Sequence, residues 1–272
     1  MKKMVQRTPT LSARKIKQMR PDLFGHVSVR TIQQRLQVDC GLPSRCPAKK
    51  PLLTDAMKQK RLAFARKHEN WTPRMWAKDM FTDESSFKTI RCTGNQKVRR
   101  SAGSDRYDRK FTIKTVKHPP GVMCWGAFSA KGRAGLFFLP PKVTRNADRY
   151  VEVLRQHCLP FMARHGTDTL LHDGAPCHKA KKVTKFLQEE APDMKVIDWP
   201  GNSPDCNPIE NAWNLIKDRL RNRDTGSVEK LKEAIKDVWC REVPADYWRK
   251  LSDSMPTRMK LVIQNNGNMT KY

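Results

Sequence analysis

Apolar residues recur at three- and four-residue steps along several stretches of the chain, which is the spacing of an amphipathic helix. The clearest stretch runs from residue 208 to residue 220, where Ile209, Ala212, Trp213, Ile216 and Leu220 share one face. Asn207 is suited to cap this helix, and Pro208 to begin it, because the first helical N–H has no intrahelical partner. By the same spacing we expect helices over residues 11–19, 28–38, 54–68, 146–165 (interrupted near Pro160), 180–190, 227–240, 244–251 and 255–264.

Other stretches have the apolar runs and turn residues of strands. The segment MWAKDMFTDESSF (75–87) predicts a strand that ends at Asp83–Glu84, and GVMCWGAFS (121–129) predicts a strong strand. A turn at AKGRAG and a returning strand at LFFLP (136–140) complete a hairpin, and short strands follow at 169–173 and 195–198. A hairpin followed by alternating strands and helices indicates an α/β fold with a mixed sheet covered by helices.

The charge of the chain points to a polyanionic partner. There are 54 Lys and Arg residues against 27 Asp and Glu residues, which gives a net charge of +27. Nucleic acid is the first candidate and an anionic membrane surface the second. We expect no membrane association, because the sequence has neither an apolar run of about 18 residues nor a signal-peptide pattern. The eight cysteines contain no C-x-x-C pair, so we expect reduced thiols.

The first 40 residues resemble a small DNA-binding module. Two short helices at 11–19 and 28–38 are separated by a break that contains Pro21 and Gly25, which suggests a helix-turn-helix. Ser28 is the expected cap of the second helix and a candidate DNA-binding residue. The polar side chains of this helix are of the types that read base edges in a major groove; they are Arg30, Thr31, Gln34 and Arg35. The alternative is a helical domain whose basic face is only solvated.

A proline-rich basic segment, CGLPSRCPAKKPLL (40–53), separates this module from the rest of the chain. Its prolines favour an extended path, and Lys49 and Lys50 could contact phosphates, serve in nuclear import or simply be solvated. The basic run from Lys88 to Lys117 is a second candidate DNA-contacting surface. We therefore divide the chain into a helix-turn-helix segment (1–40), a linker with a connecting helix (41–75) and a catalytic domain (76–272).

Three acids occupy comparable positions in the predicted fold. Asp83 and Asp173 are expected at the carboxyl ends of buried strands, where open α/β sheets place ligands. Glu210 falls in the first turn of the helix after the last strand. Alone, it also fits a capping box, in which its carboxylate would fold back onto the N–H of Asn207. Three converging carboxylates repel one another unless cations lie between them. Such ligands suit Mg²⁺ or Mn²⁺, and two ions can support in-line phosphoryl displacement. These features indicate a metal-dependent nuclease or strand-transfer enzyme.

Several blocks of the sequence resemble those of Tc/mariner transposases. They are FTDESSF (81–87), VMCWGAF (122–128), LHDGAPCHKAKKVTKFL (171–187) and WPGNSPDCNPIENAWNLIKDRL (199–220). The resemblance spans nearly the whole chain and implies a ribonuclease-H-like catalytic domain with Asp83, Asp173 and Glu210 as its metal triad. By the same resemblance, neither Glu84 nor Asp205 is expected to bind metal.

The resemblance also implies cut-and-paste transposition with two Mg²⁺ ions, for which Mn²⁺ can substitute. Terminal inverted repeats, target DNA with a TA preference, a homodimer on DNA and a nuclear location are expected on the same basis. Three departures from the family pattern stand out. The chain starts inside the second helix-turn-helix of a bipartite domain, so the first one is expected to be missing. Between Asp173 and Glu210 lie 36 residues, slightly more than the commonest family spacing, and Gly174 stands where Asn is more usual.

Two further residues are auxiliary candidates. His178 could contact metal-bound water or a DNA end, or could be structural, and Asn211 could orient Glu210 or face solvent. Two other functions stay open: a transposase-derived, sequence-specific DNA-binding protein with an idle nuclease, and a nonspecific basic nucleic-acid binder.

Overall fold

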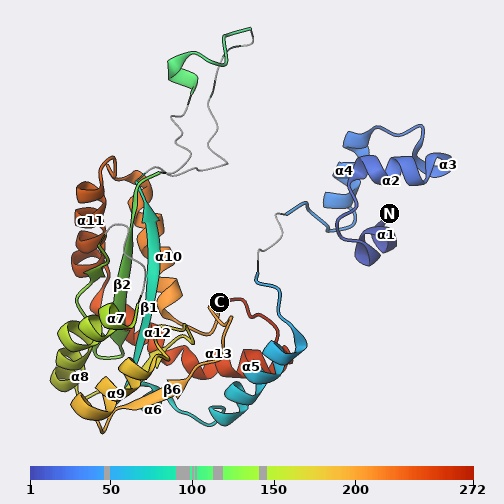
Figure 1. The fold of residues 1–272 in the computed structure, drawn as a ribbon. Coiled ribbons are helices and arrows are strands. Elements are labelled where there is room, and N and C mark those ends of the chain that lie inside the picture. The colour runs from blue at the N-terminus through green and yellow to red at the C-terminus, as the bar shows by residue number, and fades with distance from the viewer. Residues whose placement is uncertain (46–49, 90–98, 100, 102, 113–118, 141–145) are drawn as a thin grey trace. The chain divides into compact units, whose positions relative to one another are not determined.

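A computed structural model describes residues 1–45, 50–89, 99, 101, 103–112, 119–140 and 146–272. The contacts divide the chain into two compact units, Met1–Lys50 and Pro51–Tyr272, and each unit is described by itself (Figure 1). Within the described residues, no helix combines the length and apolar character needed to cross a membrane.

The first unit is a small cluster of helices around an apolar core of Ala13, Ile16, Ile32 and Leu36. It consists of α1 (Lys2–Arg7), α2 (Ala13–Met19), α3 (Pro21–Phe24) and α4 (Val29–Gln37). Helix α4 starts where the sequence predicts, because the Oγ of Ser28 accepts a hydrogen bond from the N–H of Thr31 at 3.0 Å. The break expected around Pro21 is itself a single helical turn, α3, which begins at that proline.

The second unit is built on a mixed sheet with the strand order β3-β2-β1-β5-β6, in which β4 also pairs with β2. The central strand β1 is antiparallel to β2 and parallel to β5, and β5 is parallel to β6. The bounds of the strands are Asp79–Lys88 (β1), Gly121–Ser129 (β2), Gly132–Arg133 (β3), Phe137–Phe138 (β4), Thr169–His172 (β5) and Lys195–Asp198 (β6).

Two details of the predicted strands are wrong. Strand β1 does not end at Asp83–Glu84 but continues to Lys88, because its outer half keeps pairing with β2 as far as Lys88 opposite Gly121. The returning strand of the hairpin is also divided. The piece β3 pairs with the last two residues of β2 and lies within the predicted turn, and β4 pairs with the middle of β2.

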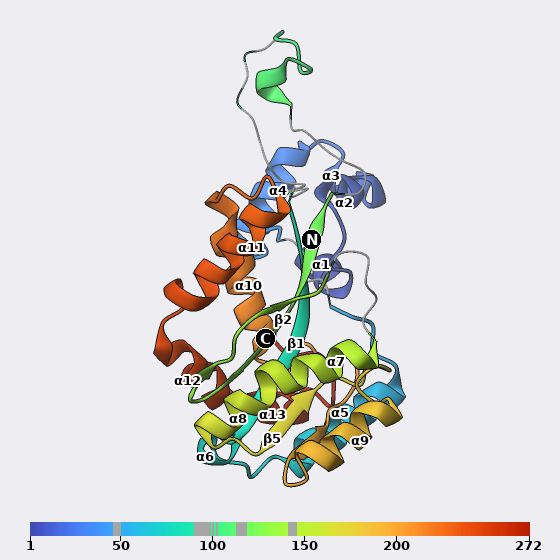
Figure 2. The same cartoon turned by 60° about the vertical axis from the view of Figure 1, so that its left-hand side comes forward.

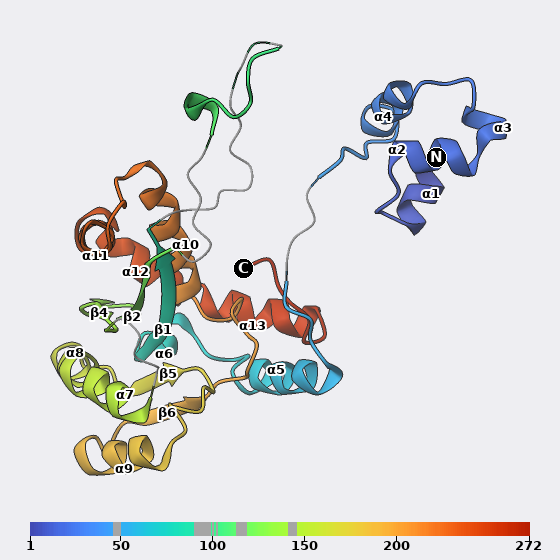
Figure 3. The ribbon, with the colours of Figure 1, turned by 45° about the horizontal axis from the view of Figure 1, so that its top comes forward.

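Helices cover both faces of the sheet, and alternate residues of each strand point to one face or the other. On one face Phe81 and Leu171 pack with helices α10 to α13, and on the other Met80 and Leu170 pack with helices α7 to α9. Figures 2 and 3 show these two sets of helices on either side of the strands. The helices are α5 (Asp55–Lys67), α6 (Pro73–Trp76), α7 (Ala147–Val153), α8 (Leu159–His165), α9 (Lys181–Glu190), α10 (Ile209–Arg219), α11 (Val228–Asp237), α12 (Ala245–Asp253) and α13 (Met255–Gln264).

The interruption expected near Pro160 takes the form of a π-helical segment, Leu154–Cys158, between α7 and α8. Pro160 follows it in the first turn of α8, where the missing N–H is tolerated. A second π-helical segment, Val238–Glu242, extends α11. The six cysteines within the described residues are free thiols.

A buried ion pair fixes the loop that leads into α10. Arg61 of α5 donates two hydrogen bonds to the carboxylate of Asp205, each at 2.8 Å, and both side chains are almost completely buried. The same carboxylate accepts the N–H of Thr270 at 2.8 Å, and Arg61 also donates to the carbonyl of Gly267. Burial penalises the charged form of Asp205, but these hydrogen bonds outweigh that penalty and hold its pKa below the usual range.

Candidate active site

Asp83 and Asp173 occupy equivalent positions on neighbouring parallel strands. In the register of β1 with β5, Asp79 lies opposite Thr169 and Phe81 lies opposite Leu171. Asp83 lies two residues beyond Phe81, in the middle of β1. Asp173 lies two residues beyond Leu171, directly after β5. The hydroxyl of Thr82 donates to the carbonyl of Leu171 at 2.9 Å and so continues the link between the strands. Strand register therefore brings the first two predicted acids to one edge.

Asn207 joins the start of α10 to β1. Its amide nitrogen donates to the carbonyl of Thr82 at 3.3 Å, and its amide oxygen accepts the N–H of Ile209 at 3.3 Å. The helix begins at Ile209, one residue later than predicted. The N–H of Asn207 donates to the carbonyl of Pro204, so it is engaged away from the capping box considered for Glu210. This one amide therefore ties the turn that carries Glu210 to the residue before Asp83.

The charges of the three acids act on one another. Burial, together with the negative charges of Glu210, Glu84 and Asp173, raises the pKa of Asp83 to about 8. Burial also raises the pKa of Glu210, and the charge of Lys217 partly offsets this. A buried carboxyl surrounded by other carboxylates is the environment that a divalent cation would relieve.

The donor set fits a hard divalent cation in type and in charge, since it consists of carboxylate oxygens. Among the residues that the structure describes, no three His, Cys, Asp or Glu side chains are already gathered tightly enough to enclose a metal ion. Of the three acids, Asp173 is held by a hydrogen bond from the N–H of Ala175. The arrangement is a set of converging ligands and not a closed cage.

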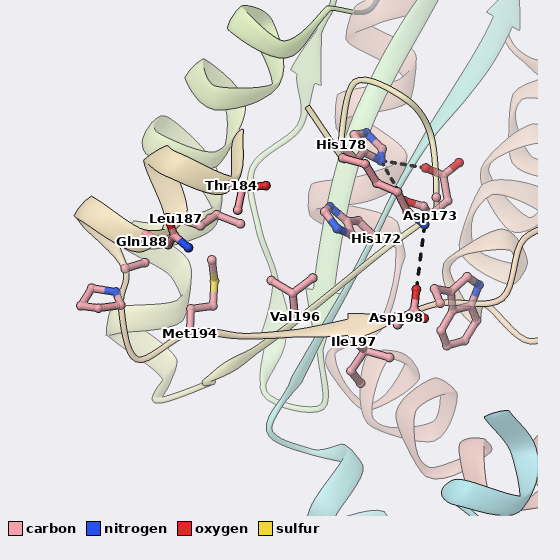
Figure 4. A pocket seen from close by; sticks show the side chains of 15 residues that line it. His172, Asp173, His178, Thr184, Leu187, Gln188, Met194, Val196, Ile197 and Asp198 are labelled. Atoms are coloured by element: carbon pink, nitrogen blue, oxygen red, sulfur yellow. Dashed lines mark hydrogen bonds and ion pairs between the residues drawn. The ribbon is translucent and has the colours of Figure 1, made fainter. Parts of the chain in front are cut away.

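His178 lies between two acids, Glu84 and Asp173, and Figure 4 shows it beside Asp173. Its Nδ1 is 2.7 Å from Oδ1 of Asp173, and its Nε2 is 3.4 Å from Oε1 of Glu84. The Oδ1 of Asp173 also accepts the N–H of Ala175 at 3.0 Å. His178 therefore contacts a predicted metal ligand directly.

The other candidates from the sequence lie in different settings. The amide oxygen of Asn211 accepts a hydrogen bond from Arg258 at 2.6 Å, so Asn211 is engaged with α13. The carboxylate of Asp205 is occupied by Arg61 and the N–H of Thr270. Glu84, which was not expected to bind metal, has its carboxylate buried against His178.

A cavity of about 470 Å³ opens beside Asp173 (Figure 4). Leu187 of α9 and Val196 of the edge strand β6 lie on its apolar side. At its polar end, Lys179 and Asp198 form an ion pair at 3.9 Å. Sequence reasoning gave no signal for this cavity, since α9 and β6 meet only through the fold.

The predicted DNA-contacting residues lie mostly on the surface of the first unit. Arg30, Gln34 and Arg35 are exposed on α4, whereas Thr31 is partly buried and its hydroxyl contacts that of Ser28 at 2.8 Å. Lys50 is exposed. Lys49 and most of the basic run Lys88–Lys117 lie outside the described residues.

Comparisons with known proteins agree with this picture. The family described as DDE superfamily endonuclease matches residues 79–232, and a transposase helix-turn-helix family matches residues 1–70. The chain is 34% identical over 251 residues to the Tcb2 transposase of Caenorhabditis briggsae, covering 90% of this chain and 88% of that protein. It is also 34% identical over 248 residues to the Tc1 transposase of Caenorhabditis elegans, with the same coverage.

Solved structures of a mariner transposase have a similar fold. The chain aligns with Mos1 transposase in a paired-end complex with a TM-score of 0.80 and 18% identity, covering 98% of this chain and 77% of that one. The isolated catalytic domain of Mos1 aligns with a TM-score of 0.62 and 17% identity, covering 82% of this chain and all of that domain. The expected ribonuclease-H-like sheet with flanking helices is thereby confirmed.

The fold and the family match over its catalytic unit define the protein as a DDE-type endonuclease joined to a helix-turn-helix module. The chain belongs to the Tc/mariner transposases. It is a DNA transposase, an enzyme that cleaves DNA and transfers the cut strand.

Proposed function

We propose that Asp83, Asp173 and Glu210 are the metal-binding triad of this transposase. The observation that carries the proposal is their convergence: strand register aligns Asp83 with Asp173, and Asn207 ties the start of α10 to Thr82. The raised pKa of Asp83, which comes from burial and from the charges of Glu210, Glu84 and Asp173, supports it.

Two Mg²⁺ ions, or Mn²⁺ in their place, are the proposed cofactor, and support comes from Mos1, whose paired-end complex is described with Mg and with Mn. When bound, such a pair supplies activation of water and stabilisation of the attacking and leaving oxygens. The protein itself provides the carboxylates, carries them on or directly beside strands and a helix, and leaves Asp83 only half-buried. The strong positive charge of the chain attracts the phosphodiester backbone.

The proposed substrates are the terminal inverted repeats of a transposon and a TA-containing target. Arg30, Gln34 and Arg35 on α4 are the proposed base-reading residues, with Lys49 and Lys50 on the backbone. A homodimer that holds two transposon ends and a nuclear location are proposed from family membership. Support comes from Mos1, whose structures are described as a paired-end complex and a Strand Transfer Complex.

The test is metal-dependent cleavage of a linear duplex that carries the element's own ends. Alanine at Asp83, Asp173 or Glu210 should abolish cleavage with Mg²⁺ and with Mn²⁺ and leave DNA affinity unchanged. Asp193→Ala, which removes an exposed acid from the loop after α9, is the matched control and should cut like the wild type. Cleavage at the wild-type rate by the three triad variants would refute the assignment.

A second candidate function, sequence-specific binding with an unused nuclease, rests on the completeness of the helix-turn-helix core around Ile16 and Ile32. The same assay separates it from the first. Retained binding with no cleavage by the wild-type protein, at any Mg²⁺ or Mn²⁺ concentration, would favour it.

A further inference from the structure

His178 is held more rigidly than its place on a loop suggests. Its side chain is only 3% exposed, and that of Glu84, which it approaches at 3.4 Å, is 5% exposed. The side chain of Asp173, on the other side of the imidazole, is 45% exposed. A buried carboxylate thus anchors one edge of the ring, and the other edge meets a carboxylate that reaches the surface.

Two aromatic side chains fix the plane of the His178 ring. The ring of Tyr150 lies 4.0 Å from it, centroid to centroid, and that of His172 stacks at 5.0 Å with an angle of 7° between the planes. The hydroxyl of Tyr150 and the Nδ1 of His172 are 2.7 Å apart, so these two neighbours also hold each other. The ring therefore has little freedom to turn away from Asp173.

Both ring nitrogens of His178 face carboxylate oxygens, Nδ1 at 2.7 Å from Oδ1 of Asp173 and Nε2 at 3.4 Å from Oε1 of Glu84. Nδ1 also lies 3.2 Å from the carbonyl oxygen of Asp173. An imidazole with a proton on each nitrogen can donate toward a carboxylate at each edge.

We propose that His178 is a positioning residue, which fixes the orientation of the Asp173 carboxylate from an anchor on Glu84. This inference rests on the proposed function, in which Asp173 is a metal ligand. The Oδ1 of Asp173 accepts the N–H of Ala175 and lies 2.7 Å from Nδ1 of His178, and two such contacts on one oxygen favour a single side-chain orientation. Ligands oriented by such partners bind metal more tightly, typically by about 10–100-fold.

A merely structural role for His178 makes a different prediction. If the ring only supported the loop after β5, then any substitution that keeps the fold would leave metal affinity unchanged. The positioning role instead requires a donor at the place of Nδ1. Asparagine and glutamine distinguish the two roles, because Asn places its amide near Nδ1 and Gln places its amide near Nε2.

The experiment is a Mn²⁺ titration of the DNA-free protein, followed by electron paramagnetic resonance, for the wild type, His178→Asn and His178→Gln. We expect His178→Gln to weaken Mn²⁺ binding by about 10–100-fold. His178→Asn should stay much closer to the wild type. The Mg²⁺ concentration for half-maximal cleavage should shift in the same order, with the rate recovering at saturating metal.

Equal Mn²⁺ affinity in all three proteins, or equal weakening in both variants, would overturn the positioning role. Melting temperatures are measured alongside. If either variant unfolds, Glu84→Gln tests the contact between Glu84 and His178 instead. This variant should bind Mn²⁺ more weakly than the wild type, and an unchanged affinity would refute the role of Glu84. Asp173→Ala distinguishes failure of the metal triad from failure of the positioning role of His178. If this variant binds Mn²⁺ and cleaves DNA like the wild type, then the assignment of Asp173 as a metal ligand is wrong.

Discussion

Gly126 lies against the six-membered ring of Trp213. A Cβ atom at Gly126 would be 2.7 Å from Cη2 of Trp213 and 3.1 Å from a methyl carbon of Leu136. Gly126 is also the partner of Asp83 in the β1–β2 pairing, and Trp213 is one turn after Glu210 on α10. The missing side chain therefore lets α10 pack close to the strand that faces Asp83.

Gly126→Ala should accordingly move α10 away from β1. We expect a loss of about 1–3 kcal/mol in the free energy of unfolding, which is typical of overpacking in a core. The rate of cleavage should fall by more than the loss of folded protein accounts for, because Glu210 would shift relative to Asp83. Chemical denaturation and the cleavage assay measure the two effects. Gly201→Ala, where a Cβ would meet nothing within 4 Å, is the control.

Asp79 should make stability fall as pH rises. It is buried, its Oδ2 lacks a hydrogen-bond partner among the described residues, and burial together with the charge of Asp168 raises its pKa to about 8. The native state then keeps a proton that the unfolded chain releases above about pH 4. Between about pH 4 and pH 8, the titration of Asp79 therefore lowers the free energy of unfolding by up to about 1.4 kcal/mol for each unit that the pH rises.

Asp79→Asn removes this titration. The variant should gain stability over the wild type as pH rises from 4 to 8, and the difference should then stay constant. Melting temperatures across this range provide the measurement, and Asp193→Asn at an exposed position should follow the wild-type curve. A constant difference across the whole range would contradict the assignment.

The ion pair between Arg61 and Asp205 should be costly to break. Arg61→Ala leaves the buried carboxylate of Asp205 without its bidentate partner, and we expect a loss of about 3–5 kcal/mol in the free energy of unfolding. Lys60→Ala, at an exposed position on the same helix, should change stability little. Urea denaturation of both variants tests this, and similar stabilities would contradict it.

Arg30 and Arg35 should determine sequence preference. Replacing either with alanine is expected to cost about 1–3 kcal/mol of binding to the element's ends if it reads a base edge. Binding to unrelated DNA should change much less. DNA-binding titrations at several salt concentrations distinguish a phosphate contact from a base contact. Loss of a phosphate contact makes affinity depend less steeply on salt concentration, whereas loss of a base contact lowers the preference for the element's ends over unrelated DNA. Lys185→Ala on α9 is the control.

The sequence predicts those features that depend on neighbours in the chain. Helix α10 follows from the spacing of Ile209, Trp213 and Ile216, and β2 follows from its apolar run. The length of β1 could not be predicted, since its outer half is held by pairing with residues 121–126. The local spacing also fitted a capping box at Glu210. In the fold, however, the N–H of Asn207 donates to the carbonyl of Pro204.

The surroundings of the site were harder to predict. The motif LHDGAPCH drew attention to His178 because it follows Asp173, and it could equally have drawn attention to His172. Nothing in the sequence indicates that Glu84 contacts His178, or that Tyr150 from α7 packs against the same ring. These contacts depend on how β1, α7 and the loop after β5 come together.

The pairing of Arg61 with Asp205 has a consequence for how this chain can be divided. Helix α5 stands between the helix-turn-helix and the sheet in the sequence, yet its arginine completes the loop before Glu210 and reaches the C-terminal residues at Gly267. A fragment that begins after α5 would lose that arginine, whereas one that begins before Thr54 keeps it. Exchange of DNA-recognition modules between relatives should therefore use a junction ahead of Thr54, and a protease should release a core that still contains α5.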